Sequence, residues 1–210
     1  MASSCAALLA ANPEAWRGAI EHPFLDECQS GAIREAQFNA WLVQDGRFAT
    51  EFTRFAGSML TKAPAARLDL LLGGLGALKD ELLWFAATAA KRGLPPPPGA
   101  PPHPACQRYL QFMDNAAKQP YAVHAVVFWA IERCYWEAWS SHLPMREPYH
   151  SFALRWGSPE FGAYVGELEQ MADEALAAGS EAERVEAAAV FLKVCQLERE
   201  FWAMAYSEGK

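Results

Sequence analysis

Four acidic residues lie in runs of aromatic and aliphatic residues whose spacing would place them on one face of a helix: Asp45, Glu81, Glu132 and Glu198. Glu132, for example, has aromatic residues three positions before it and three, four and seven positions after it, which is the repeat of an amphipathic helix. Stripping water from an ionised carboxylate costs several kcal/mol, so acids are rarely buried without a compensating partner. The pattern therefore predicts that the four acids come together in one polar pocket with aromatic walls.

A pocket of this kind favours two kinds of chemistry. Burial raises the pKa of a carboxyl group, so that it can act as a general acid or base near neutral pH. The amino groups and ring nitrogens of a flat heterocycle can hydrogen-bond to carboxylates while its face stacks on aromatic side chains. The alternative is structural: each acid would cap a buried amide or pair with a nearby arginine such as Arg47, Arg155 or Arg199.

A helical protein rich in carboxylates can also hold a di-iron centre, which requires inward-facing Glu-x-x-His pairs. The chain has one such spacing, Glu147 and His150, and the proline directly after the glutamate places it near a helix start. The remaining histidines lack partner spacing or lie beside prolines. The sequence therefore predicts a site that contains no metal and requires no cofactor.

The elements that would position the acids are helices. Apolar residues repeat at helical spacing through nearly the whole chain, and no alternating run of β-branched residues occurs. Helix starts are indicated by Asn12 before Pro13, by Ser158 before Pro159, and by the capping box of Ser180 and Glu183. We predict an all-α fold with helices over about 13–31 (interrupted at Pro23), 34–62, 65–93, 104–118, 120–143, 147–156, 158–179 and 180–207.

Glycines and prolines mark two special stretches. The helix predicted over 65–93 contains Gly73, Gly74 and Gly76, and because glycine is unfavourable inside a helix we expect close helix contact, a bend or room for a ligand there. Residues 94–104 hold seven of the fourteen prolines, which predicts an extended, polyproline-like surface connection. Since neither half obviously closes its own core, we interpret residues 1–210 as a single domain.

Composition excludes several classes of protein. The chain has 210 residues, 52% of them hydrophobic, and a net charge of −7, which argues against disorder and against nucleic-acid partners, because phosphate binding needs a basic surface. No run approaches the length of a membrane span, and the first residues lack the basic segment of a signal peptide. The five cysteines are scattered without a CxxC pair, as is typical of reduced thiols, so we expect a cytoplasmic protein that does not bind membranes.

Five segments resemble the TenA/thiaminase II family, in the same order along the chain: FNAWLVQDGRFATEF (38–52), LGGLGALKDELLWF (72–85), VFWAIERCYWEAW (127–139), RWGSPEF (155–161) and LEREFWAMAY (197–206). The resemblance implies a heme oxygenase-like helical bundle that acts on the pyrimidine moiety of thiamin and its breakdown products. It also implies a homo-oligomer, either a dimer or a tetramer.

Some members of the family use a cysteine nucleophile at or near the position of Phe128, where this chain has none. The chain is similar instead to the cysteine-less (TenA_E-type) group, which carries a glutamate at the position of Glu132 and includes plant and bacterial aminopyrimidine aminohydrolases. Cys134 lies about 200° round the helix from Glu132 and is expected to face away from the pocket. Cys195 shares the face of Glu198, but we interpret it as a core residue.

The resemblance implies thiamin salvage: hydrolysis of N-formyl-aminopyrimidine, of aminopyrimidine, or of both, to hydroxymethylpyrimidine. Asp45 would bond the amino group and ring nitrogen of the pyrimidine, Glu198 would be the general acid/base, and Glu132 would activate water. Further substrate-binding residues would be Phe48, Glu81, Tyr109, Phe128, Trp129, Trp156 and Trp202. Gly46 and Arg47 depart from the aromatic-rich run of relatives, and the long proline connection is also not typical of them.

Two other functions stay open on the sequence alone. The chain could be a non-catalytic protein that binds the pyrimidine or another small heterocycle. It could also be a metal-dependent oxidase of the same fold.

Overall fold

The computed structural model describes residues 4–95 and 101–208, and within these ranges every regular element is a helix. This confirms the all-α prediction. The chain divides into two compact units, each assembled from two stretches of sequence. The first unit takes the residues up to Ile33 together with Pro120–Ala203, and the second takes Arg34–Gln119 together with the residues from Met204 onward.

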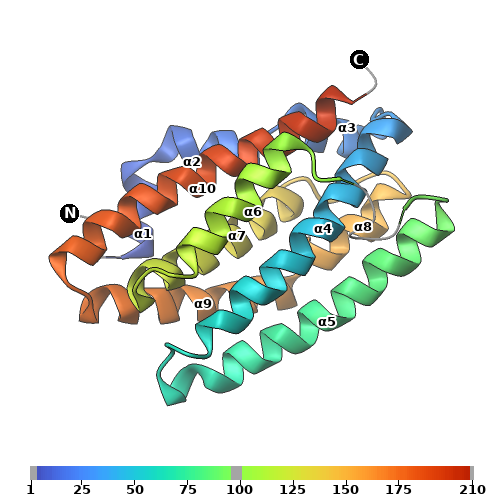
Figure 1. Ribbon diagram of the computed structural model, residues 1–210. Coiled ribbons are helices and arrows are strands. Elements are labelled where there is room, and N and C mark those ends of the chain that lie inside the picture. The colour runs from blue at the N-terminus through green and yellow to red at the C-terminus, as the bar shows by residue number, and fades with distance from the viewer. Residues whose placement is uncertain (1–3, 96–100, 209–210) are drawn as a thin grey trace. The chain divides into compact units, whose positions relative to one another are not determined.

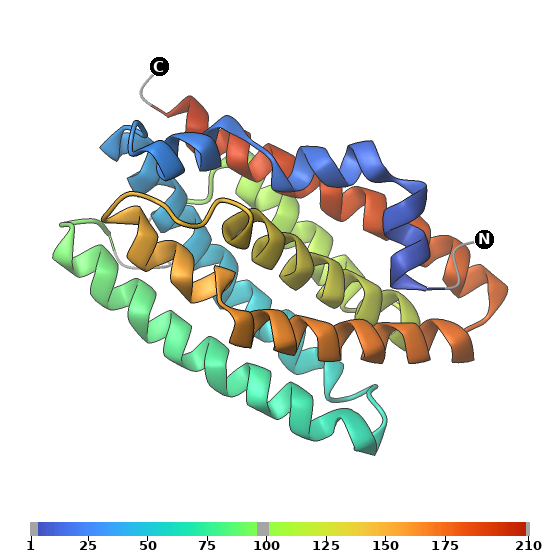
Figure 2. The same cartoon turned by 180° about the vertical axis from the view of Figure 1, so that it is seen from behind.

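The first unit is organised around α7 (Tyr121–Ser140), of whose twenty residues fifteen are buried. Three helices pack against α7: α2 (Pro13–Ile20), α8 (Tyr149–Gly157) and α9 (Pro159–Ala178). Figure 2 shows α9 running beside α7. Ring contacts of Tyr135 and Trp139 with Trp202 join α7 to α10 (Glu181–Ser207), and the unit is completed by α1 (Cys5–Ala11) and α3 (Pro23–Ser30).

The second unit is organised around α4 (Glu35–Met59), which packs against α5 (Leu68–Lys91) and α6 (Pro104–Ala116). A short 3-10 helix, Ala65–Arg67, precedes α5, and Figure 1 shows α4 and α5 as an antiparallel pair. Arg92 joins the end of α5 to the start of α4, because its guanidinium lies 5.3 Å from the centroid of the Phe38 ring and its Nε donates to Asn39 Oδ1 at 2.6 Å. These contacts hold the helix that carries Asp45.

Side chains cap the helix starts much as the sequence indicates. Ser158 Oγ accepts from the Phe161 amide at 3.2 Å, and the Ser180–Glu183 capping box is present in both directions. His22 and His103, two histidines beside prolines, are also N-caps, because Nδ1 of each accepts from the amide two residues later.

The prediction that the Asn12 side chain caps the start of α2 is wrong. Asn12 precedes α2, but its side chain makes no hydrogen bond to that helix and instead donates to the Leu8 carbonyl at 2.8 Å, closing α1. Helix α1 was not predicted, and the segment expected over 13–31 forms two helices that end at Ile20 and Ser30. The second of these stops at Gly31, which has a left-handed φ of 75°.

The glycine cluster in α5 does not mark close helix contact at Gly73 or Gly76, and it does not break the helix. A Cβ added at Gly73 or Gly76 would meet nothing within 4 Å, and α5 runs without a break from Leu68 to Lys91. Gly74 is the buried glycine of the three, and room for a ligand beside the cluster stays a prediction. In the proline-rich connection, Pro101 and Pro102 are not helical, and 96–100 lie outside the described residues. The single-domain interpretation stays a prediction.

A partly buried charge network joins α2, α7 and α9 in the first unit. Trp16 Nε1 donates to Glu137 Oε2 at 2.6 Å, and Arg133 bonds both Glu137 and Glu169, with Nε and Nη1 distances of 2.7 and 3.0 Å. The side chains of this ion triad are only 22–27% exposed, so water screens them less than it screens a surface pair.

We expect Arg133→Met to lower the free energy of unfolding by about 2–3 kcal/mol, because it leaves two half-buried carboxylates without their cation. Lys118→Met is the matched control: the Lys118–Asp114 pair is 65–69% exposed, so its loss should cost less than about 0.5 kcal/mol. Urea unfolding followed by circular dichroism measures both. Equal effects of the two substitutions would show that the network contributes no more than a surface ion pair.

Candidate active site

Three of the four predicted acids are buried. The exposed fraction is 3% for Asp45, 9% for Glu132 and 2% for Glu198, whereas Glu81 on α5 is half-buried. Glu132 and Glu198 belong to the first unit, and Asp45 and Glu81 belong to the second. The prediction that these acids lie within apolar helix faces is therefore confirmed for three of them. Their convergence on one pocket stays a prediction.

In the first unit, Glu198 lies on α10 within electrostatic range of two thiols. Its negative charge adds to burial in raising the pKa of both Cys134 and Cys195. Cys134 belongs to α7, so the effect places Glu198 close to that helix as well. Its thiol is directed to α2, since Sγ lies 3.5 Å from the Ala19 carbonyl oxygen.

Glu132 lies two positions before Cys134, and its charge acts on a residue of α9 instead. Burial first, and the charge of Glu132 second, raise the pKa of the Tyr164 hydroxyl on α9. A close helix approach makes this possible: a Cβ at Gly162 would lie 2.7 Å from the Trp136 ring, so only glycine lets α9 come so near to α7. Cys134 therefore contacts α2 whereas Glu132 acts on α9, as expected for residues about 200° apart on α7.

Tyr164 is a candidate that the sequence analysis missed. Its hydroxyl oxygen is buried and makes no hydrogen bond within the described residues. A buried hydroxyl beside a carboxylate can donate to a substrate or to an attacking water. The signal was present in the sequence, because Tyr164 follows Phe161 by three positions and so extends the helical face of the RWGSPEF segment.

An aromatic cluster lies between α7, α8 and α10. Tyr135 stacks on Trp202 with ring centroids 5.8 Å apart and meets Trp156 edge-on at 5.4 Å, and Trp139 contacts both tryptophans. Trp202 also donates through Nε1 to the Ala19 carbonyl at 2.9 Å. The structure therefore brings the predicted residues Trp156 and Trp202 together, both of them buried.

Phe128 and Trp129 are predicted lining residues that are also deep in the protein, with exposed fractions of 1% and 0%. Trp129 stacks on Phe191 of α10 at 5.9 Å, and Phe191 in turn stacks on Trp16 of α2 at 5.6 Å. The indole N–H of Trp129 makes no hydrogen bond within the described residues. Its ring has a packing role, while its substrate-binding role stays a prediction.

The second unit groups Asp45 with Cys106 and two aromatic residues. Cys106 on α6 lies against α4, with Sγ 3.8 Å from the Gln44 carbonyl. Burial and the charge of Asp45 raise the pKa of Cys106, which the Arg47 charge partly lowers, giving a value of about 12. The arginine that departs from the family pattern is therefore electrostatically close to the same thiol as Asp45.

Phe48 and Tyr109 form the aromatic part of this group. Their ring centroids lie 4.8 Å apart at a tilt of 58°, and Phe48 also stacks on Phe52 at 5.7 Å. Both are buried. The structure thus brings together two residues that were predicted to line the ring-binding site, and it places Glu81 on a different helix, α5, beside the Trp84–Phe85 pair in sequence.

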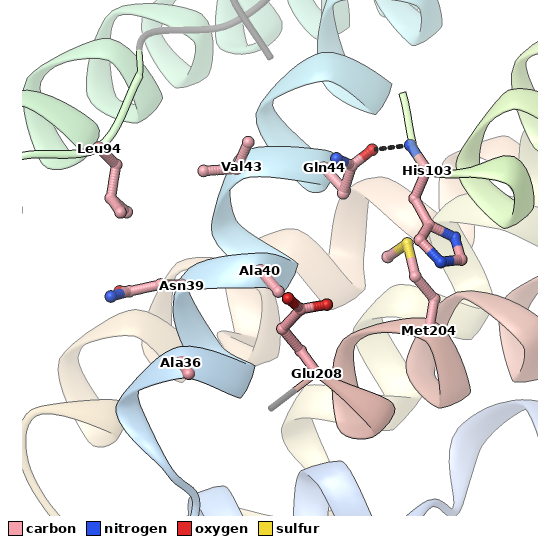
Figure 3. A pocket seen from close by; sticks show the side chains of 9 residues that line it. All are labelled: Ala36, Asn39, Ala40, Val43, Gln44, Leu94, His103, Met204 and Glu208. Atoms are coloured by element: carbon pink, nitrogen blue, oxygen red, sulfur yellow. Dashed lines mark hydrogen bonds between the residues drawn. The ribbon is translucent and has the colours of Figure 1, made fainter. Parts of the chain in front are cut away.

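A separate cavity of about 310 Å³ lies in the second unit between α4, the end of α10 and the residues around His103 (Figure 3). Its walls are aliphatic side chains with Asn39, Gln44, His103 and Glu208, and Gln44 Oε1 accepts from the His103 amide at 2.9 Å. None of its lining residues is aromatic apart from the His103 imidazole, and none was predicted to bind substrate. This cavity therefore lacks the stacking surface that a pyrimidine requires.

The five cysteines are all buried. Burial raises the pKa of every thiol, to about 12 for Cys106 and Cys195. It likewise holds the pKa values of Cys5, Cys28 and Cys134 well above the ordinary value of a thiol. Because the thiolate is the nucleophilic form of cysteine, these residues are poor nucleophiles near neutral pH.

The described residues also bear on metal binding and on membrane insertion. In the part of the chain that the structure describes, no group of three or more His, Cys, Asp or Glu side chains is arranged to hold a metal ion. Among residues 4–95 and 101–208, no helix combines the length and apolar character needed to cross a bilayer.

These features define an all-helical protein with deeply buried carboxylates, buried thiols of raised pKa, and aromatic clusters on the same helices as the acids. The chain belongs to the TENA/THI-4/PQQC family, whose sequence profile matches residues 10–208. It is 31% identical over 201 residues to the "Probable bifunctional TENA-E protein" of Glycine max, covering 90% of this chain and 87% of that one. It is 25% identical to the "Aminopyrimidine aminohydrolase" of Halalkalibacterium halodurans, covering 92% and 91%.

A solved structure, a TenA homologue from Pyrococcus furiosus, superposes with a TM-score of 0.89 at 28% identity and covers 95% of this chain and 98% of that one. This agreement extends the family assignment to the three-dimensional fold.

We expect the folded protein to resist alkylation by iodoacetamide at about pH 8, because raised pKa values keep the thiols protonated there. Mass spectrometry should find the five cysteines unmodified in the native protein and all five modified after unfolding in urea. Rapid, stoichiometric modification of one native cysteine, with loss of activity, would contradict the absence of a cysteine nucleophile.

Proposed function

We propose that the protein is a thiamin salvage hydrolase that converts N-formyl-aminopyrimidine, aminopyrimidine, or both, to hydroxymethylpyrimidine. The observation that carries the proposal is the burial of Glu132 and Glu198 in one unit, where the pKa values of the two thiols near Glu198 are raised. Membership of the TENA/THI-4/PQQC family supports the proposal. So does similarity to proteins named as an aminopyrimidine aminohydrolase and as a probable bifunctional TENA-E protein. The proposal includes membership of the group that lacks the nucleophilic cysteine.

The reaction requires one base and one acid. In the amine reaction, the oxygen of water bonds to the methylene carbon, the carbon–nitrogen bond breaks and ammonia leaves. In the formamide reaction, water adds to the formyl carbon, the bond between that carbon and nitrogen breaks, and formate leaves. The released aminopyrimidine then undergoes the amine reaction to give hydroxymethylpyrimidine. Both need a proton removed from water and a proton delivered to the departing nitrogen, so two carboxyl groups in opposite protonation states suffice.

We assign the base to Glu132 and the acid to Glu198. Glu132 takes the proton of the attacking water, and the Tyr164 hydroxyl, which lies within reach of the Glu132 charge, can orient that water. Glu198 delivers its proton to the leaving nitrogen, and proton exchange with solvent then restores both groups. Each proton transfer of this kind contributes about 10²–10⁴-fold to a rate.

We assign recognition of the pyrimidine to Asp45. A carboxylate can accept from the exocyclic amino group and from a protonated ring nitrogen at the same time. Phe48 and Tyr109, which contact each other in the same unit, are assigned to the ring faces. Glu81, Phe128, Trp129, Trp156 and Trp202 complete the proposed substrate-binding set.

The same proposal places the protein in the cytoplasm as a homo-oligomer, a dimer or a tetramer. Buried, protonated thiols without a disulfide agree with a reducing compartment.

We expect Glu198→Gln and Glu132→Gln each to lower kcat for aminopyrimidine hydrolysis by about 10²–10⁴-fold, because glutamine keeps the shape of the side chain but transfers no proton. Chromatography measures the rate at which hydroxymethylpyrimidine is released. Glu186→Gln, which removes an exposed acid from the same helix as Glu198, is the control and should leave kcat unchanged.

Other outcomes separate the alternatives. Wild-type kcat in both glutamine variants would refute the assigned roles. Tight binding of hydroxymethylpyrimidine by a wild-type protein that hydrolyses neither substrate would identify a non-catalytic binding protein. Stoichiometric iron or manganese in the purified protein, together with oxygen consumption, would identify an oxidase.

We expect Asp45→Asn to raise the Kd for hydroxymethylpyrimidine by about tenfold or more, because hydrogen bonds to a charged acceptor are among the stronger ones. Isothermal titration calorimetry measures this Kd directly. Asp114→Asn, at an exposed position on α6 in the same unit, should bind like the wild type. An unchanged Kd in Asp45→Asn would remove this acid from the proposed site.

A further inference from the structure

The first turns of α9 lie directly against one tryptophan of α7. A Cβ added at Gly162 would lie 2.7–2.8 Å from the Cε2, Cζ2 and Nε1 atoms of the Trp136 ring, whereas an ordinary contact of a Cβ is at least 3.4 Å. Gly166, about one turn further along α9, has open space at the same place, with nothing within 4 Å. Of these two glycines, Gly162 is therefore the one whose missing side chain allows α9 its approach to α7.

The Trp136 ring is held at two points. Its Nε1 donates to the Ser158 carbonyl at 3.3 Å, and the same carbonyl accepts from the Gly162 amide at 3.0 Å in the first turn of α9. The Arg133 guanidinium lies over the ring, 5.2 Å from its centroid, and forms an ion pair of 3.0 Å with Glu169 on α9. The ring can move aside only by giving up these contacts, so a methyl group at position 162 would widen the gap between the two helices.

Tyr164 follows Gly162 by two positions in the same helix. Backbone hydrogen bonds join each helical turn to the next, so a shift of the first turns of α9 moves both residues. The Tyr164 hydroxyl is buried and makes no hydrogen bond within the described residues. Burial raises the pKa of this hydroxyl, and the charges of Glu132 on α7 and Glu167 on α9 raise it further. The spacing of α9 from α7 therefore sets how near the hydroxyl lies to the proposed base.

We propose that Gly162 is a positioning residue for the reaction assigned above. Its missing side chain allows α9 to lie against Trp136, and this spacing holds the Tyr164 hydroxyl where it can orient the attacking water. Gly162 acts through Tyr164 and has no side chain with which to take part in the chemistry. The inference rests on the proposed hydrolase function, but the placement of Tyr164 beside Glu132 can be measured without turnover.

Gly162→Ala and Gly166→Ala form a matched pair, because both add one methyl group to α9 and only the first meets a neighbour. We expect Gly162→Ala to lower kcat for aminopyrimidine hydrolysis by about tenfold or more, since a misplacement of about 1 Å can cost about 10²-fold in rate. KM should stay within about twofold, because none of the side chains assigned to the pyrimidine is on α9. Gly166→Ala should keep the wild-type kcat. A wild-type kcat in Gly162→Ala would overturn the inference and leave the hydrolase proposal intact.

A second substitution distinguishes a displaced helix from a weakened fold. Trp136→Leu removes the three ring atoms that the new methyl group would meet, together with the hydrogen bond to Ser158. Added to Gly162→Ala, it should raise kcat by about twofold or more while the midpoint of urea unfolding falls further. A purely structural role of Gly162 would make activity and stability fall together, and that result would contradict the inference.

The placement of Tyr164 can be followed by NMR in protein labelled with ¹³C at the tyrosine Cζ. This signal reports the hydrogen bonding and the charge near the hydroxyl, and Tyr164→Phe assigns it. At neutral pH, Gly162→Ala should shift the signal in the same direction as Glu132→Gln, which removes the neighbouring charge, whereas Gly166→Ala should leave it in place. An unmoved signal in Gly162→Ala would refute the inference, whether or not the wild-type protein hydrolyses aminopyrimidine.

Discussion

The cost of keeping carboxylates away from water is the constraint on which the rest of the structure depends. Asp45, Glu132 and Glu198 are all nearly or fully buried, and an ionised carboxyl in such a place must be offset by charge, hydrogen bonds or a changed protonation state. Each of the three lies on a helix of 20–27 residues. Such length lets aromatic residues pack on the turns above and below the acid, so the apolar contacts of several turns offset one unfavourable burial.

The same burial has opposite consequences for carboxyl and thiol chemistry. Near an acid, a buried cysteine becomes a weaker acid itself, and Cys134 shows this most clearly because Glu198, Cys195 and burial all act in the same direction on its pKa. A site that concentrates carboxylates is therefore a poor place for a thiolate nucleophile. Phe128 and, one helical turn later, Glu132 are therefore physically consistent with the proposed hydrolysis without a cysteine nucleophile.

The sequence predicted helix starts correctly where the capping hydrogen bond involves only a few neighbouring residues. Ser158 and Ser180 mark helix starts because each makes its capping bond within three residues. Pro104 marks one because proline suits the first helical position. Gly73 and Gly76 do not lie in close helix contact, which the sequence could not show, because glycine at a helix position does not reveal whether a neighbouring helix or open space lies outside it. Asn12 misled for a related reason: an asparagine between two helices can cap either one, and here it bonds backwards to Leu8.

The protonation and hydrogen-bonding of buried polar side chains could not be predicted without the tertiary structure. Tyr164 continues an aromatic helical face in the sequence, but only the structure shows that its buried hydroxyl lies within reach of the Glu132 charge. The residue type of Tyr164 alone suggests packing. A buried polar atom that makes no bond at all carries a free-energy penalty which a bound molecule can relieve. Unsatisfied hydrogen-bonding groups therefore indicate where ligands act more directly than residue type or helical spacing does.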